Sequence, residues 1–207
     1  MSVFVISAFT IGLLHALAPD HWLPFVMLGK TQQWSKWKTT TVVFLAGLGH
    51  VSSSVVIAII GLLLGSAVQH VYGWESIRGN VASMLLIGFG VAYTLWGIKQ
   101  WRQPHSHSHS HDKAKIVSYW TLFALIVFGP CEPLIPLIFA SVPYGWMTVA
   151  VVFSIFTFVT LLMMQLQVHM ALFGLSFFHS HWLEHAGDII AGSVIALTGV
   201  ALRVFGL

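Results

Sequence analysis

Six long apolar segments constrain the fold of this chain more than any other feature. A helix needs about 20 apolar residues to cross a bilayer. The segments that meet this length are residues 3–28, 41–68, 79–101, 116–142, 145–172 and 187–206. Charged residues make up only 7% of the 207 residues, against about a quarter in soluble domains. We therefore predict an all-α polytopic membrane protein, a single transmembrane domain over residues 1–207 with about six transmembrane helices.

The basic residues are unevenly distributed along these segments. Most of them lie at two connections that face the same side of the membrane: Lys30, Lys36, Lys38, Lys99, Arg102, Lys113 and Lys115. The positive-inside rule makes that side cytoplasmic and places both termini outside, and Arg203 argues mildly against it. We expect no nucleic-acid partner, because the chain lacks the dense basic face that such binding requires.

The first segment carries three ligand-grade side chains, His15, Asp20 and His21. Ionisable groups in hydrocarbon cost a few kcal/mol each, so such a cluster indicates a functional site. On an unbroken helix the two histidines would lie roughly 120° apart and could not share an ion. Pro19 lacks an N–H and clashes with the carbonyl of His15, so the helix should open there. The opened turn could bring the three side chains together and free backbone carbonyls as ligands; the alternative is a helix end with interfacial polar residues.

The second segment carries His50 at its middle, with Ser53 and Ser54 on the same helical face. A single membrane histidine often serves only as a hydrogen-bonding partner between helices. Because the first segment already carries a cluster of potential ligands, we interpret His50 as a further metal ligand or as a gate. Gly47 and Gly49 would let another helix approach closely.

These residues together resemble the signature of the nickel/cobalt transporter superfamily. The match consists of His15, four residues, then Asp20 and His21, and of the Gly-His-Val-Ser run around His50. Importers of that family carry a second Asp where this chain has Ala18, so the resemblance is to the efflux-type and urease-accessory-like branch. It implies Ni²⁺ or Co²⁺ transport across a prokaryotic plasma membrane, with these His and Asp side chains as the transport site.

A His-rich loop of residues 102–115 separates the third and fourth segments. Alternating His and Ser cannot pack a core, so we expect a solvated loop whose imidazoles bind divalent metal. The imidazoles belong to His105, His107, His109 and His111. Imidazole suits Zn, Cu, Ni and Co alike. The orientation above makes this loop a cytoplasmic metal collector; the alternative is a plain polar linker.

The fourth segment contains a second proline-rich break. Pro130, Pro133 and Pro136 should interrupt the helix, and Cys131 and Glu132 offer a soft and a hard metal ligand there. Glu132 is also a candidate for a proton-coupling carboxylate or for pairing with a histidine. Cys131 could equally be an ordinary buried thiol.

The two halves of the chain are comparable in pattern. In the fifth segment Gln165 and His169 are four residues apart and share a face, which makes His169 a further ligand candidate. In the first half, the proline-broken first helix precedes the helix with His50. In the second half, the proline-broken fourth helix precedes the helix with His169. Three spans per half would make this a 3+3 inverted repeat, the arrangement that holds substrate between the repeats near the bilayer midplane.

Two enzyme classes and a sensor compete with this interpretation. The Pro-Cys-x-x-Pro pattern resembles membrane thiol-disulfide carriers, but these need a second cysteine and Cys131 is the only one. His181-x-x-Glu184-His185 matches the inverted zincin pattern of an intramembrane metalloprotease. That enzyme needs a further acidic ligand, and only Asp188 follows. A metal-docking patch of His181 and His185 is the simpler explanation.

The sequence therefore predicts secondary transport of a divalent transition metal and no enzymatic activity. The Gly-rich Lys-Ser/Thr motif of ATP-driven transporters is absent from the sequence. We expect no permanently bound cofactor, Ni²⁺ or Co²⁺ as cargo with Zn²⁺ as an alternative, and the lipid bilayer as surroundings. A second copy of the chain or a metallochaperone is the expected protein partner. A metal sensor would use the same ligands, and only flux separates the two.

Overall fold

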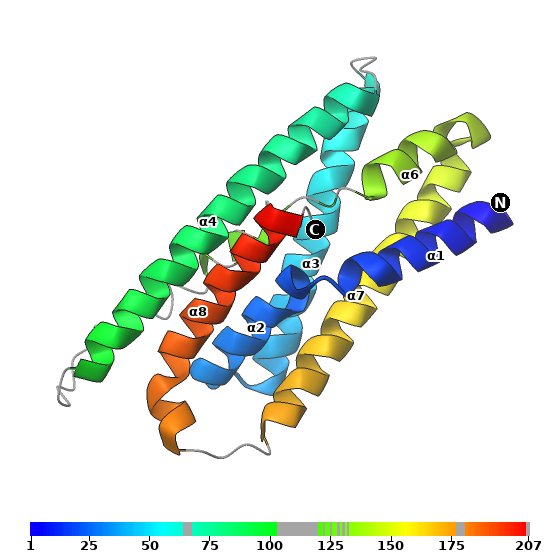
Figure 1. Cartoon of the computed structure of the whole chain (residues 1–207). Coiled ribbons are helices and arrows are strands. Elements are labelled where there is room, and N and C mark those ends of the chain that lie inside the picture. The colour runs from blue at the N-terminus through cyan, green and yellow to red at the C-terminus, as the bar shows by residue number, and fades with distance from the viewer. Residues whose placement is uncertain are drawn as a thin grey trace.

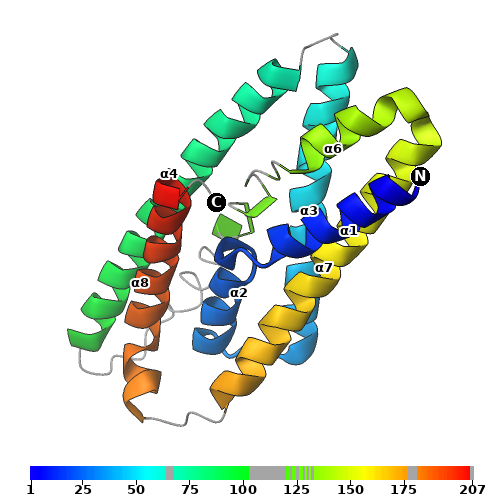
Figure 2. The same ribbon diagram turned by 45° about the vertical axis from the view of Figure 1, so that its right-hand side comes forward.

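The computed structural model shows an all-helical chain (Figures 1 and 2). It describes residues 1–63, 68–102, 133–176 and 181–205, together with residues 120, 121, 123, 124, 126, 127, 129 and 131. The described helices are α1 (Ser2–Ala16), α2 (Pro19–Thr31), α3 (Lys36–Leu63), α4 (Val68–Arg102), α6 (Leu134–Ser141), the 3₁₀ turn η1 (Val142–Tyr144), α7 (Trp146–Ser176) and α8 (His181–Phe205). No strand occurs within these ranges, so the predicted all-α class is confirmed for the part of the chain that the structure describes.

Four of the helices in the described part of the chain are long and apolar enough to cross a membrane. They are the apolar stretches Lys36–Gly61, Ser76–Arg102, Trp146–Ser176 and Ala186–Val204, and the bent pair α1 and α2 makes a fifth if it counts as one span. The chain is therefore a multi-pass membrane protein, as predicted. The sixth span stays a prediction, because much of the segment 116–142 lies outside the described residues.

The predicted opening of the first segment is confirmed. α1 ends at Ala16, α2 begins at Pro19, and the two helices meet at a bend of 45°. Ala18 between them is extended, with φ −59° and ψ 131°, because a residue before proline is driven out of the helical region. Pro19 then serves as the first residue of α2, where its missing N–H costs nothing.

α8 lies side by side with the C-terminal part of α4 (Figures 1 and 2). Small residues make this possible, because a Cβ atom on Gly90 would lie 2.7 Å from Ala196 Cα, and one on Gly199 would lie 2.9 Å from Ile87 N. Gly97 is equally close to Ile189 of α8. Close backbone approach through small residues is the usual way in which membrane helices associate.

The predicted close approach at Gly47 and Gly49 of α3 is also confirmed. A Cβ atom on Gly47 would lie 2.6 Å from a methyl carbon of Leu161 in α7. A Cβ atom on Gly49 would lie 2.7 Å from Val127. α3 is therefore packed tightly against α7 and against the segment that precedes α6.

Two apolar cores hold the helices together. The first is built mainly from α2, α3, α4, α7 and α8, and the second from α1, α3, α6 and α7. On α3 the first core reaches to Ala46 and the second begins at Val51. His50 therefore lies at the junction between the two cores, which is where the polar residues of the first segment meet it.

The second proline-rich segment also interrupts the helix where it was expected to. α6 begins at Leu134 with Pro133 as its N-cap, and it covers only eight residues. Pro136 fits within its first turn, where a proline N–H is not needed. Between the fourth and fifth apolar segments lies the 3₁₀ turn η1, closed by Gly145 at φ +92°, a conformation that favours glycine.

Candidate metal centre

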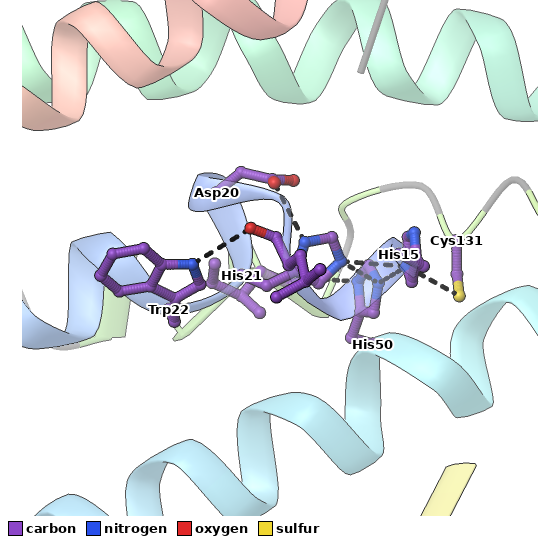
Figure 3. A network of polar contacts seen from close by, with 8 residues as sticks. His15, Asp20, His21, Trp22, His50 and Cys131 are labelled. Atoms are coloured by element: carbon purple, nitrogen blue, oxygen red, sulfur yellow. Dashed lines mark hydrogen bonds and ion pairs between the residues drawn. The ribbon is translucent and has the colours of Figure 1, made fainter. Parts of the chain in front are cut away.

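Three imidazoles from three helices converge at the break between α1 and α2 (Figure 3). His15 lies in the last turn of α1, His21 in the first turn of α2, and His50 in the middle of α3. The Nε2 atoms of His15 and His21 are 3.0 Å apart, those of His21 and His50 3.2 Å, and those of His15 and His50 3.4 Å. We call these three residues the imidazole triangle.

The size of the imidazole triangle fits one shared metal ion. Imidazole nitrogens bind Zn²⁺ at about 2.0–2.1 Å, so two nitrogens in neighbouring tetrahedral or octahedral positions lie about 2.9–3.4 Å apart. All three Nε2 separations fall in that range. His21 and His50 are each 3% exposed, so the nitrogens that face one another have little access to lipid or bulk water.

The second ring nitrogens of two histidines are already engaged. His21 Nδ1 lies 3.0 Å from Asp20 Oδ1, and His50 Nδ1 lies 3.0 Å from the carbonyl oxygen of Ile126. Both oxygens are acceptors, so in the neutral rings each Nδ1 donates its proton. The Nε2 atoms of His21 and His50 then each carry a lone pair, and the two lone pairs face each other. A cation between them can accept both. Fixing one ring nitrogen so that the other is presented to a metal is typical of metal sites.

Asp20 lies beside the imidazole triangle and contacts it through one ring. Its carboxylate is the hydrogen-bond acceptor of His21 Nδ1, on the side of the ring that faces away from His15 and His50 (Figure 3). The sequence interpretation grouped Asp20 with the direct ligands. The structure brings it into the cluster as the group that orients His21.

Several backbone carbonyls at the break already accept hydrogen bonds. The N–H of Ala18 donates to His15 O at 3.1 Å, and the N–H of Leu17 donates to Leu14 O at 3.2 Å. The indole N–H of Trp22 contacts Leu17 O at 3.4 Å. The carbonyls of Leu14, His15 and Leu17 are therefore engaged locally, and the side chains supply the ligand atoms that point toward His50.

Cys131 reaches the same cluster from the segment before α6. Its side chain is fully buried, and its Sγ lies 3.4 Å from His15 Nε2. The ligand atoms of His15, His50 and Cys131 all lie within 4.8 Å of one another. His15 and His50 thus contribute both to the imidazole triangle and to a group that includes the thiol.

A cavity of about 400 Å³ adjoins the imidazole triangle. Its polar lining outside the centre comes from Ser76, Asn80 and Ser83 of α4 and from Arg203 at the end of α8. One water occupies about 30 Å³ in the liquid, so the cavity has room for an ion with several waters. The centre therefore borders a space large enough for a hydrated ion.

His169 lies at a different place in the fold. Its Nε2 contacts Thr40 Oγ1 at 2.9 Å, and Gln165 Nε2 donates to Thr40 O at 2.8 Å. The predicted common face of Gln165 and His169 is therefore confirmed. His169 lines a second cavity of about 930 Å³, together with Lys30 and Asp188, and the structure does not bring it to the imidazole triangle.

Several predicted ligands cannot be placed. Glu132 and the loop histidines His105, His107, His109 and His111 lie outside the described residues. α8 begins at His181, but the side chains of His181 and His185 also lie outside the described part. The metal collector, the docking patch and the carboxylate ligand of the fourth segment stay predictions.

Sequence reasoning missed Arg78. Its Nη2 donates to Ser53 Oγ at 3.0 Å, to Ser54 Oγ at 3.2 Å and to the carbonyl oxygen of Gly129. The apolar run of the third segment was drawn from residue 79, which left Arg78 just outside it. The signal that could have revealed it is the pair of serines one turn beyond His50, which offer acceptors to a partly buried charge.

The chain resembles no characterised protein closely enough to identify it. No family model matches the sequence, no curated protein is detectably similar, and no solved structure shares the fold at a significant level. The resemblance to nickel/cobalt transporters therefore rests on the motif residues of the first two segments alone.

Proposed function

We propose that this protein is a secondary transporter of divalent transition-metal ions that binds its cargo at the imidazole triangle. The observation that carries the proposal is the convergence of His15, His21 and His50, whose Nε2 atoms lie 3.0–3.4 Å apart at a helix break in a multi-pass membrane protein. Broken helices that present ligands inside the membrane are how many secondary transporters hold ions. Imidazole ligands favour Ni²⁺, Co²⁺ and Zn²⁺ over Mg²⁺ and Ca²⁺.

The position of the two cavities supports transport over sensing. Leu202 at the end of α8 lines the cavity beside the imidazole triangle, whereas Gly187 near the start of α8 lines the second cavity. The first apolar core lies between them, with Phe25 and Leu28 fully buried in it. The centre is thus reachable from one cavity and closed toward the other, which is the arrangement of a carrier with its site open to one side.

The proposal includes the membrane topology that the sequence predicts. The termini lie outside, the His-rich loop lies in the cytoplasm, and two inverted halves of three spans each surround the site. The positive-inside rule supports the orientation. The two proline-broken segments, one ending in α2 and the other in α6, support the relation between the halves.

Metal flux into proteoliposomes that contain the purified protein tests the proposal. Ni²⁺, Co²⁺, Zn²⁺ and Mn²⁺ are supplied in turn, and the metal inside the vesicles is measured over time. We expect flux of at least one of the first three ions, little flux of Mn²⁺, and loss of at least 90% of that flux in His21→Ala.

His169→Ala is the matched control, because it removes an imidazole that lies outside the triangle. This variant should transport at close to the wild-type rate. No flux of any ion by a folded wild-type protein that binds metal would contradict transport and favour a sensor. Normal flux in His21→Ala would contradict the assignment of the site.

A further inference from the structure

A guanidinium group lies close to the proposed metal centre and contacts three acceptors through one nitrogen. Arg78 Nη2 donates to Ser53 Oγ at 3.0 Å, to Ser54 Oγ at 3.2 Å and to Gly129 O. Arg78 lies near the start of the apolar stretch Ser76–Arg102 of α4. An arginine within a membrane segment is costly and generally has a functional reason.

The acceptors of Arg78 connect α3 to the segment that carries Cys131. The Cys131 N–H donates to Ser54 Oγ at 3.2 Å, and Ser53 Oγ lies 2.8 Å from Val127 O. Gly129 lies between these two contacts, and its carbonyl is held by Arg78 itself. α3, α4 and the segment that carries Cys131 are therefore joined at this point, and the backbone of Cys131 is one of the groups that is held.

The cysteine that this arrangement fixes faces the imidazoles. Cys131 Sγ lies 3.4 Å from His15 Nε2, and no part of the side chain is exposed. Thiolate binds Zn²⁺ at about 2.3 Å and imidazole at about 2.0–2.1 Å, so a sulfur and a nitrogen that share one ion lie about 3.1–3.6 Å apart. The observed distance therefore fits joint ligation by Cys131 and His15.

We infer that Cys131 is a thiolate ligand of the transported ion and that Arg78 is the positioning residue that holds it there. This inference rests on the proposed function and names the class of cargo more closely. A mixed imidazole and thiolate site favours Zn²⁺, Co²⁺ and Ni²⁺ and disfavours Mn²⁺, which prefers oxygen ligands. When the ion binds, the S–H bond of Cys131 breaks, the S–metal bond forms, and the proton leaves to water in the adjoining cavity.

Optical spectroscopy of the full-length protein loaded with Co²⁺ in detergent tests the inference. Co²⁺ bound to imidazole shows d–d bands in the visible range, and a thiolate ligand adds a sulfur-to-metal charge-transfer band in the near ultraviolet. We expect both signals in the wild type and only the d–d bands in Cys131→Ser. Arg78→Met should still bind Co²⁺ but lose more than half of the charge-transfer intensity.

Arg78→Lys separates positioning from a merely structural role. An ammonium group carries three N–H donors, enough for the two serine oxygens and the carbonyl of Gly129, so this variant should keep most of the charge-transfer band. Ser54→Ala removes the acceptor of the Cys131 N–H and should weaken the band. Ser193→Ala is its control, because the Ser193 hydroxyl donates within α8, to Ile189 O at 2.8 Å, and the band should not change.

Each failure points to a different part of the account. A full charge-transfer band in Arg78→Met would overturn the role of Arg78, and if that variant is not recovered folded, a full band in Ser54→Ala would overturn it instead. Visible bands without charge transfer in the wild type would show that Cys131 is not a ligand, while imidazole binding would stand. No bound Co²⁺ in the wild type would contradict the proposed function as well.

Discussion

At the scale of single residues, the decisive feature is which ring nitrogens are already used. His21 and His50 each engage Nδ1 with an oxygen acceptor and present Nε2 to the other histidines. Nitrogen lone pairs at 3.2 Å repel one another unless a proton or a metal ion lies between them. The hydrogen bonds around the imidazole triangle thus prepare it for a cation before the cation arrives.

The role assigned to Asp20 makes a specific prediction. Asp20→Asn should weaken metal binding about 10- to 100-fold, because outer-shell partners of ligating histidines typically contribute that much to affinity. The number of ions bound per chain should not change, since the imidazole triangle is intact. Calorimetric titration with Ni²⁺ or Zn²⁺ measures both quantities.

Asp188→Asn is the control for this change. Asp188 accepts a hydrogen bond from the Tyr93 hydroxyl at 2.8 Å and lines the second cavity, so its amide variant should bind metal normally. Complete loss of binding in a folded Asp20→Asn protein would show instead that Asp20 is a direct ligand.

The sequence predicted which histidines meet but not how each is held. Pro19 and the spacing from His15 to His21 sufficed to predict an opened turn that brings both rings to one place. The function of Asp20 could not be predicted, because its spacing does not indicate which ring nitrogen of His21 it faces. Arg78 was overlooked because hydropathy marks where an apolar run starts and not where a helix starts.

At the scale of helices, breaks and close contacts determine where the polar residues lie. α1 and α2 separate at Ala18, which directs His15 and His21 toward the same point, and α3 supplies His50 between the two apolar cores. Sequence patterns predicted the long helices well, because continuous apolar runs have few other solutions in a bilayer. They were less informative around α6. The apolar run continues there without a gap, but the prolines keep some of its residues out of a helix.

The contact between α4 and α8 gives a prediction at this scale. Gly90→Leu should destabilise the protein by about 1–3 kcal/mol or more, because overpacking of a tight contact forces the backbones apart. A side chain at this position would collide with backbone atoms of Ala196 and Gly192. Thermal unfolding in detergent measures the change.

Gly88→Leu is the matched control on the same helix. A Cβ atom at Gly88 meets nothing within 4 Å. Gly88→Leu therefore gains as much helix propensity as Gly90→Leu does, but without a collision. It should unfold at or slightly above the wild-type temperature. Equal destabilisation of the two variants would contradict the close packing of α4 on α8.

At the scale of the whole molecule, the candidate metal centre lines one of two cavities that differ in character. The smaller cavity is lined by the imidazole triangle, and the larger one is lined by His169 and by Lys30 and Lys36. Apolar side chains of the first core separate them. In the proposed transport, the helices around this core would have to rearrange, and the 45° bend between α1 and α2 is a candidate hinge.

The measurement that tests this account most directly is metal binding by the purified protein without its His-rich loop. Equilibrium dialysis with Ni²⁺, Co²⁺ or Zn²⁺ is compared for the wild type, His50→Ala and His169→Ala, all three lacking the loop so that its histidines are not counted. The account predicts one ion per chain in the wild type and in His169→Ala, and at least a 100-fold weaker affinity in His50→Ala. Equal affinity in all three proteins would show that the ion binds elsewhere and would contradict the imidazole triangle as the metal centre.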